Sequence, residues 1–354
     1  MSTVMILGAG VPRAAQQKNT VGKRPPLDKD FFEIARLGKY SEYRSVVEYL
    51  EKLFGEYSTT LTQSLETAAT YLYLKAVDSK SNSVHHTAFL NFLFLLNSVL
   101  ANTTNDLSLG HPSLLYRFLL NEIKKLDTDS SKLTIITFNY DLLIENVLQR
   151  IADKNGSDIF AFPGCYRMEK ADYVSPIIGT RGQEKFQEIN EKWSGIEVLK
   201  LHGSMNWQSL HTSQTPEIRA LFNSNRKLYI NSSQKISESL EWKRNKRKMY
   251  LKPILIPPIS GKRGMMHTSV LKLWDIAKNK LHEANRIVIA GYSCPPLDLE
   301  ARALLTEGFR SNESKKLFII DPNSQSAAKF LNLCGATNTT IYSSIKSWVE
   351  DNPD

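Results

Sequence analysis

Short, almost continuous apolar runs recur along the chain, and each ends in glycine or a polar residue. Four stand out: TVMILGAG (3–10), KLTIITFNYD (132–141), ANRIVIAGYS (284–293) and KKLFIIDPN (315–323). A fifth run, GIEVLKLHGS (195–204), is similar. Such runs are typical of strands that are covered on both faces. Helical patterns lie between them, so the alternation predicts an α/β fold with a doubly wound parallel sheet.

Two long intervals interrupt this alternation. Residues 33–130 carry helical periodicity in several stretches and predict a helical insertion or subdomain. Residues 155–260 are mixed, and their Pro257-Pro258 pair cannot continue a central strand. We therefore expect one domain over residues 1–354, with the helical insertion at 33–130 and a small irregular lobe at 155–260.

The composition is that of an ordinary globular protein, with 354 residues, 42% hydrophobic and 23% charged. Only three cysteines occur, and none is in a CxxC pair, which argues against a disulfide framework and a four-thiolate zinc module. The N-terminus lacks a signal-peptide pattern, and the apolar stretch at 88–100 is short for a membrane span. These features predict a cytoplasmic protein with no metal and no membrane contact.

The chain carries a formal net charge of +9, and its strongest basic cluster is WKRNKRKMYLK (242–252). Such a cluster is either a solvated basic edge or a surface for nucleic acid or another acidic partner. Aromatic residues of the kind found in nucleic-acid-binding segments do not interleave with it. The charge alone therefore leaves both alternatives open.

The polar ends of the runs predict a shared site, because ligands of doubly wound sheets bind outside the carboxyl ends of the strands. The first run ends in three small residues whose backbone N–H groups would approach a pyrophosphate: Gly8, Ala9 and Gly10. Arg13 would add a phosphate contact, but it also breaks the GxGxxG fingerprint, so a tight turn is the alternative. Asp28 follows in RPPLDKDFF (24–32), where a mobile loop would fold over a nucleotide.

Two runs carry candidates for catalysis. Asn139 is expected to point from a strand end into the cleft, while Asp141 either caps the next helix or belongs to the site. His202, alone among seven histidines, follows an apolar strand and precedes a glycine. A neutral imidazole can take a proton from a hydroxyl near neutral pH, although a lone histidine here would more often be a core residue.

The remaining runs offer residues for a phosphate, a ribose or an adenine edge. Each residue alone is also common in turns. The candidate binding residues in these runs and beside Asn139 are Thr137, Phe138, Gly291, Tyr292, Ser293, Asp321 and Asn323.

Taken in order, GAG, TFNYD, LHGS, AGYS and IIDPN resemble the sirtuin-like NAD-binding fold, from residue 4 to about 325. GYSCPPLDLEARALL and PPLDKDFF resemble the Sir2-like proteins of bacterial anti-phage systems more than deacylases. Sirtuin deacylases carry a four-cysteine zinc module that this chain cannot build, and ILIPP (254–258) replaces the strand that binds their peptide. Pro12, Phe138 and Tyr140 also depart from the sirtuin motifs.

The resemblance implies NAD+ hydrolysis to nicotinamide and ADP-ribose, by a regulated antiviral defence effector that depletes NAD+. It assigns Asp141 to the nicotinamide, Asn139 to positioning water near C1′, and His202 to the ribose hydroxyls and the role of base. It also implies a homo-oligomer, and a HerA-type ATPase or another activator as partner. Two alternatives remain: a protein deacylase or ADP-ribosyltransferase of the same fold, and a non-catalytic module that binds NAD, ADP-ribose or nucleic acid.

Overall fold

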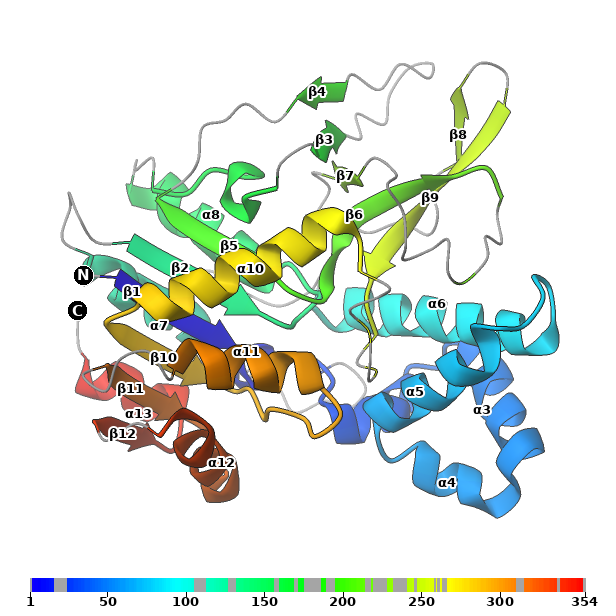
Figure 1. Cartoon of the computed structure of the whole chain (residues 1–354), viewed down its shortest axis with the longest axis horizontal. Helices are drawn as coiled ribbons and strands as arrows, with labels where there is room; N and C mark the ends of the chain where they lie inside the picture. Colours follow the sequence, from blue (N-terminus) through cyan, green and yellow to red (C-terminus); the bar gives the residue numbers. More distant parts are fainter. Residues whose placement is uncertain are drawn as a thin grey trace.

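A six-stranded parallel sheet forms the centre of the protein in a computed structural model (Figure 1). Its strand order is β12-β11-β10-β1-β2-β5. The strands are β1 (Ser2–Leu7), β2 (Lys132–Thr137), β5 (Ile196–Lys200), β10 (Arg286–Ala290), β11 (Lys316–Ile320) and β12 (Thr339–Tyr342). The structure describes residues 2–15, 24–104, 113–126, 132–155, 159–168, 171–174, 186–188, 195–213, 218, 228–231, 241–244, 247–257, 259, 262, 266–309, 315–335 and 338–352.

The five predicted apolar runs supply the first five of these strands, and the predicted α/β fold with a doubly wound parallel sheet is confirmed. Strand β12 was not predicted, because its four residues are half-buried or exposed at the sheet edge and lack an apolar run. Strand β1 lies between β2 and β10, so the chain adds later strands first on one side of β1 and then on the other. This is the topological switch point at which such sheets bind ligands.

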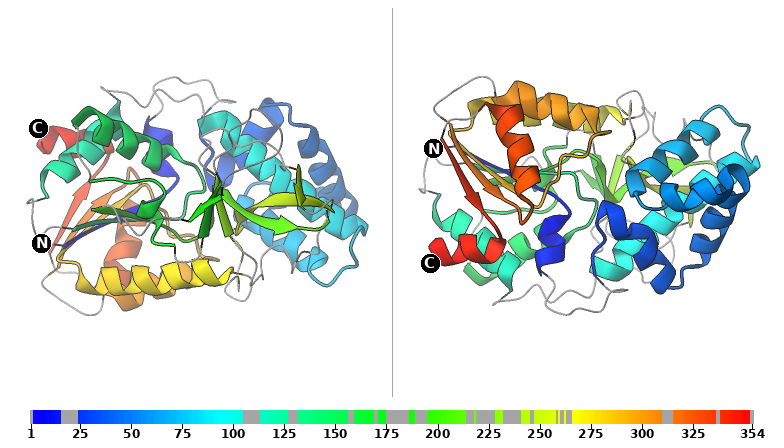
Figure 2. Two further views of the ribbon diagram at one scale, coloured as in Figure 1. Left: turned by 90° about the horizontal axis from the view of Figure 1, so that it is seen from above. Right: turned by 90° about the horizontal axis from the view of Figure 1, so that it is seen from below.

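Helices cover both faces of the sheet (Figure 2). One face carries α1 (Gly10–Ala15), α7 (Leu114–Lys124), α8 (Leu143–Asn155) and α13 (Ile345–Asp351). The other carries α10 (Thr268–Glu283), α11 (Leu299–Phe309) and α12 (Ser324–Cys334). Strands β1, β2, β5 and β10 are almost entirely buried, which explains their continuous apolar sequences.

A helical unit lies beyond the carboxyl ends of the central strands (Figure 1). It contains η2 (Asp28–Asp30), α2 (Phe31–Leu37), α3 (Ser41–Phe54), η3 (Gly55–Tyr57), α4 (Ser58–Leu61), α5 (Leu65–Ala76) and α6 (Val84–Thr104). These helices enclose a hydrophobic cluster of their own, built around Phe31, Phe92 and Leu95. Helix α7, which the sequence reading placed in the helical segment 33–130, packs instead in the cluster of the parallel sheet.

Helix α6 is longer than the apolar stretch at 88–100 suggested. The helix has 21 residues, and an 18-residue window within it has a mean hydropathy of 1.4, which satisfies the length and composition of a membrane span. Half of that window is buried within the protein, and α6 lies against α3 and α5. A core helix of a globular protein passes the same test, so the helix is weak support for a membrane span.

The segment 155–260 contains a second six-stranded sheet, so it is more regular than the predicted irregular lobe. Its strand order is β4-β3-β7-β6-β9-β8, and all neighbours except β3 and β7 are antiparallel. The strands are β3 (Ala171–Val174), β4 (Phe186–Glu188), β6 (Gly203–His211), β7 (Leu228–Asn231), β8 (Glu241–Arg244) and β9 (Arg247–Leu255). The basic stretch 242–252 lies in β8 and β9, except for positions 245 and 246, which are outside the described residues.

Candidate functional site

Three glycines bring the loops after β1 and β10 into close contact at the switch point. The Gly8 N–H donates to the Ala290 carbonyl at 3.0 Å, and the Gly10 N–H donates to the Gly291 carbonyl at 2.8 Å. A Cβ atom on Gly8 would lie 2.5 Å from the Gly291 carbonyl oxygen. The small residues of the GAG sequence therefore allow the two loops to approach each other. The N–H groups of Gly8 and Gly10, which were predicted to bind a pyrophosphate, already donate to these carbonyls.

Arg13 and Asp28 both have partners from the start of the helical unit. Arg13 forms an ion pair with Asp30, which Arg24 also approaches at 3.3 Å. Burial, followed by the nearby Arg24 charge, lowers the pKa of Arg13 to about 10. The Asp28 carboxylate accepts hydrogen bonds from the Glu66 N–H (2.8 Å) and the Ser64 hydroxyl (3.2 Å), so it ties the 24–30 segment to α5. Their predicted nucleotide contacts stay predictions.

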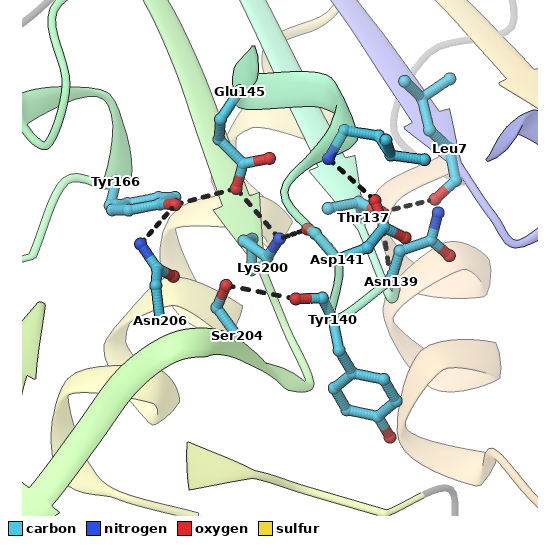
Figure 3. A network of polar contacts seen from close by, with 11 residues as sticks. Leu7, Thr137, Asn139, Tyr140, Asp141, Glu145, Tyr166, Lys200, Ser204 and Asn206 are labelled. Atoms are coloured by element: carbon cyan, nitrogen blue, oxygen red, sulfur yellow. Dashed lines mark hydrogen bonds and ion pairs between the residues drawn. The ribbon is translucent and has the colours of Figure 1, made fainter. Parts of the chain in front are cut away.

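The TFNYD segment after β2 connects two hydrophobic cores. Phe138 belongs to the core of the parallel sheet, and Tyr140 belongs to the core of the helical unit. Between them, the Asn139 N–H donates to the Thr137 hydroxyl at 3.1 Å, and that hydroxyl donates to the Leu7 carbonyl at 2.8 Å (Figure 3). The buried Asn139 Nδ2 has no hydrogen-bond partner among the described residues. A buried amide without a partner is uncommon in a native protein and suits a ligand-binding position.

Asp141 caps α8. One carboxylate oxygen accepts a hydrogen bond from the Leu143 N–H at 3.0 Å, and the Asp141 carbonyl accepts one from the Lys200 ammonium. Burial raises the pKa of Asp141, while Lys200 opposes that rise. Lys200 also pairs with Glu145 at 2.9 Å (Figure 3). The capping alternative for Asp141 thus has direct structural support, and its nicotinamide role stays a prediction.

His202 occupies the turn that links the two sheets, directly after β5 and before β6. Gly203 there has φ +84°, and a Cβ atom would lie 2.1 Å from the Ile254 carbonyl oxygen, so only glycine fits. The His202 carbonyl accepts from the Ile256 N–H at 2.9 Å, and the Trp274 indole donates to the Leu201 carbonyl at 3.0 Å. The backbone of His202 is therefore fixed by both neighbouring elements.

The His202 side chain is buried in a cage of rings and charges. Its ring centroid lies 5.0 Å from that of Phe138 and 6.3 Å from that of Trp274. The Nε2 atom lies 2.7 Å from Lys262 Nζ and 3.1 Å from Asp298 Oδ2, while Lys262 Nζ lies 2.6 Å from Asp298 Oδ1. Burial lowers the pKa of His202, and the Lys262 charge lowers it further, so the imidazole is neutral at physiological pH.

Asp298 is the anion of this cluster. Burial alone would raise its pKa, but His202 and then Lys262 hold it well below its usual range. Its Oδ1 atom also accepts the Ala301 N–H at 3.2 Å and so caps α11, which leaves Oδ2 facing His202.

Glu66, in the first turn of α5, brings a further carboxyl group from the helical unit. Its side chain is buried, and its Oε1 atom has no hydrogen-bond partner among the described residues. Burial, then the charges of Asp28 and Asp298, raises the pKa of Glu66 to about 7, against the opposing effect of Lys262.

The other predicted binding residues follow the strand ends, and they differ in burial and in their contacts. Phe138 and Tyr292 stack with centroids 4.4 Å apart, and the buried Tyr292 hydroxyl has no partner among the described residues. Ser293 is exposed. Asp321 accepts the Asn323 N–H at 2.7 Å, and Asn323 caps α12, so the turn alternative accounts for both hydrogen bonds.

A pocket of about 280 Å³ opens beside this cluster, between α10 and α11. Trp274 and Glu300 contribute to its lining, together with Met266, Leu271, Leu299 and Leu304. Trp274 also contacts the His202 ring, so the pocket borders the aromatic wall of the cluster.

Within the described part of the chain, no three His, Cys, Asp or Glu side chains are grouped so as to hold a metal ion. The polar groups nearest to His202 are instead Lys262 and Asp298.

Sequence reasoning missed three members of the cluster: Glu66, Lys262 and Asp298. Asp298 stands in AGYSCPPLD, directly after a predicted strand, and this position was its only signal. Glu66 resembles any acidic residue of a first helical turn, and Lys262 lies in the loop-like sequence SGKRG.

Neither a protein-family model nor a curated protein sequence matches the chain. Among solved structures, it is similar to a Sir2 homologue mutant in complex with ADP-ribose, at 13% identity and a TM-score of 0.43. It is also similar to a Sir2 complex with a p53 peptide and NAD+, at 13% identity and a TM-score of 0.40. Each alignment covers 99% of this chain and 90% of the other. Likeness at this level carries no inference about activity.

Proposed function

We propose that this protein is an NAD+ glycohydrolase, which cleaves NAD+ to nicotinamide and ADP-ribose. The observation that carries the proposal is the position of Asn139 and His202 after two neighbouring strands, at the carboxyl edge of the sheet. Asn139 follows β2, and its buried Nδ2 atom has no hydrogen-bond partner in the described part of the chain, while His202 follows the adjacent strand β5 with a buried, neutral imidazole. Asn139 follows the strand next to the switch point, where doubly wound sheets bind nucleotides, and the His202 ring contacts the neighbouring Phe138.

The chemistry needs few groups. Cleavage breaks the bond between C1′ and the nicotinamide nitrogen, and the electron pair of that bond leaves with the nicotinamide. Positive charge then builds up on C1′ and the ring oxygen, as in other glycosidic cleavages. Water forms the new C1′–O bond and gives up a proton, which a neutral histidine can accept.

In this reaction Asn139 orients the water or a ribose hydroxyl, and His202 accepts the proton. The stacked rings of Phe138 and Tyr292 form an apolar wall that excludes bulk water. Because nicotinamide leaves as a neutral molecule, the cleavage needs neither a metal ion nor an acid for the leaving group. The groups given these roles lie on three segments, after β2, β5 and β10, that the fold brings together.

The proposed physiological role is NAD+ depletion by a regulated antiviral effector, with control by a homo-oligomer or an activating partner such as a HerA-type ATPase. The resemblance of GYSCPPLDLEARALL and PPLDKDFF supports this role. A cytoplasmic location fits it, since NAD+ is the substrate.

The test compares wild type with Asn139→Ala in cells and as purified proteins. The wild type should lower cellular NAD+ and release nicotinamide, and the Asn139→Ala variant should be slower by on the order of 100-fold, as expected for loss of a positioning group. Chromatography of the products measures nicotinamide and ADP-ribose. Equal NAD+ loss in cells with either protein would contradict the proposal. Nicotinamide release only with an acyl-lysine peptide would favour the deacylase alternative instead.

A further inference from the structure

The Nε2 atom of His202 faces two groups that it cannot satisfy at the same time. Lys262 Nζ lies 2.7 Å away and can only donate, whereas Asp298 Oδ2 lies 3.1 Å away and can only accept. In a neutral imidazole each nitrogen is either a donor or an acceptor. Lys262 therefore selects the form with an unprotonated Nε2, and Asp298 selects the form with a protonated Nε2.

The two forms differ in whether the imidazole ring has a free lone pair to accept a proton. With Lys262 on Nε2, the ring proton is on Nδ1, and the only lone pair of the ring is already used. With Asp298 accepting from Nε2–H, the Nδ1 lone pair is free to take a proton from water or a ribose hydroxyl. The change between the forms moves one proton off Nδ1 and one onto Nε2, so the charge of the ring is unchanged.

The shorter contact is the one to Lys262, which favours the form in which Nε2 accepts from the ammonium group and His202 cannot act as a base. The surroundings contain another acceptor for the ammonium group. Glu66 Oε1 is buried and has no hydrogen-bond partner among the described residues, and its carboxyl group interacts electrostatically with Lys262. Glu66 belongs to α5 of the helical unit, whereas His202 and Asp298 belong to the sheet side of the site.

We propose that Asp298 is the positioning residue of His202, and that Lys262 withholds the imidazole until it moves from Nε2 toward Glu66. The inference rests on the proposed NAD+ hydrolysis and adds a control to the same site. Movement of the helical unit relative to the sheet would change the distance between Glu66 and Lys262. A partner that binds α2–α6 would thus change the availability of the His202 base through Glu66 and Lys262.

The alternative is that Asp298 and Lys262 have only a structural role, because Asp298 caps α11 through Oδ1 and pairs with Lys262. The two readings predict opposite results for Lys262→Met in the purified protein. A structural lysine predicts a slower enzyme. Our proposal predicts a faster one, by on the order of tenfold or more, because a general base contributes about 10²- to 10⁴-fold.

Asp298→Asn provides the complementary variant, because asparagine still caps a helix but cannot accept from Nε2–H through its amide nitrogen. It should lower kcat by on the order of 100-fold, alone and in combination with Lys262→Met. Lys315→Met is the matched control: Lys315 is also buried, and its Nζ donates to the Leu281 and Gly308 carbonyls away from this site. It should reduce stability without raising the rate.

The pH profile supplies a readout that a structural role would not change. The charged or titratable groups around His202 are Lys262, Asp298, Glu300 and Tyr140, with Glu66 acting on Lys262 and Asp298. Because the Lys262 charge lowers the pKa of His202, its removal raises that pKa. The acid limb of kcat/KM should therefore move to higher pH in Lys262→Met.

Nitrogen NMR of ¹⁵N-histidine-labelled protein tests the inference separately from any activity. His202→Asn assigns the signal, and the wild type should show Nδ1–H with an acceptor Nε2, while Lys262→Met should show Nε2–H. A wild type with Nε2–H would overturn the inference, as would a folded Lys262→Met variant that is no faster than wild type. Absence of NAD+ hydrolysis in every variant, with the expected NMR result, would overturn the proposed function and leave the tautomer assignment in place.

Discussion

Two buried lysines lie close to the carboxyl edge of the sheet, and their surroundings differ. Lys200 donates to the Asp141 carbonyl and to Glu145, and Tyr166 donates to the same carboxylate at 2.9 Å (Figure 3). The two donors share the Oε1 atom of Glu145, and these contacts do not compete, because each donor meets an acceptor. Around Lys262, two groups compete for one nitrogen of His202. Buried polar atoms of Glu66, Asn139 and Tyr292 have no hydrogen-bond partner within the described ranges.

The difference separates support from function. A buried network whose contacts are mutually compatible holds its backbone in one arrangement, whereas a network with competing contacts retains an alternative arrangement. The Lys200 network joins β5, α8 and the turn at Asp141, so it fixes the segment that carries Asn139. The Lys262 cluster has more than one way to pair its groups.

The largest expected effect comes from breaking the supporting network. Lys200→Met should lower the free energy of unfolding by about 3–5 kcal/mol, because it leaves Glu145 buried without its counter-ion. Denaturant unfolding followed by fluorescence or circular dichroism measures this change. The double variant Lys200→Met/Glu145→Leu should recover much of the loss, since it removes the unpaired charge as well. A loss below about 1 kcal/mol in the single variant would remove the contrast between the two lysines.

A smaller effect, dependent on pH, is expected at Glu66. Its pKa in the folded protein is raised to about 7, so its stabilising contribution is present below about pH 4.5 and is lost as the pH rises through about 7. Glu66→Gln should therefore match wild type near pH 5 and be more stable near pH 8, by about 2 kcal/mol.

Denaturant midpoints at the two pH values measure the Glu66 effect. Glu48→Gln is a suitable control, because Glu48 is an exposed helical carboxylate paired with Arg44 at the surface. Its replacement should leave the pH dependence of wild type almost unchanged. A Glu66→Gln variant with the same pH dependence as wild type would mean that this carboxyl group titrates normally, and it would not then distinguish the two clusters.

The central sheet could be predicted from the sequence because its strands are covered on both faces and so read as apolar runs. Edge strand β12 could not, since its residues are half-buried or exposed and form no apolar run. Asn139 and His202 were recognised because they directly follow such runs. This signal is local in sequence, whereas the topology of the fold decides which strand ends are neighbours.

The rest of the cluster comes from segments that carry no comparable signal. Glu66 and Lys262 stand 136 and 60 positions from His202 along the chain, and only the folded helical unit and the second sheet bring them to it. Residue type gave no help, because an acidic residue in a first helical turn and a lysine between glycines are both typical of solvent-exposed positions. The unpaired atoms that mark this site are properties of the folded state alone.

The smallest expected effect tests whether the Lys200 network is only supporting. Tyr166→Phe removes one hydrogen bond to Glu145 but leaves the ion pair with Lys200 intact. We expect a loss of about 1.5 kcal/mol in the free energy of unfolding, the lower end of the range for a hydrogen bond to a charged group. The rate of NAD+ hydrolysis should not change, because the remaining Lys200 contacts still hold the Asp141 turn. A rate that fell at unchanged stability would show that this network also tunes Asn139, and the division between a supporting and a functional lysine would then fail.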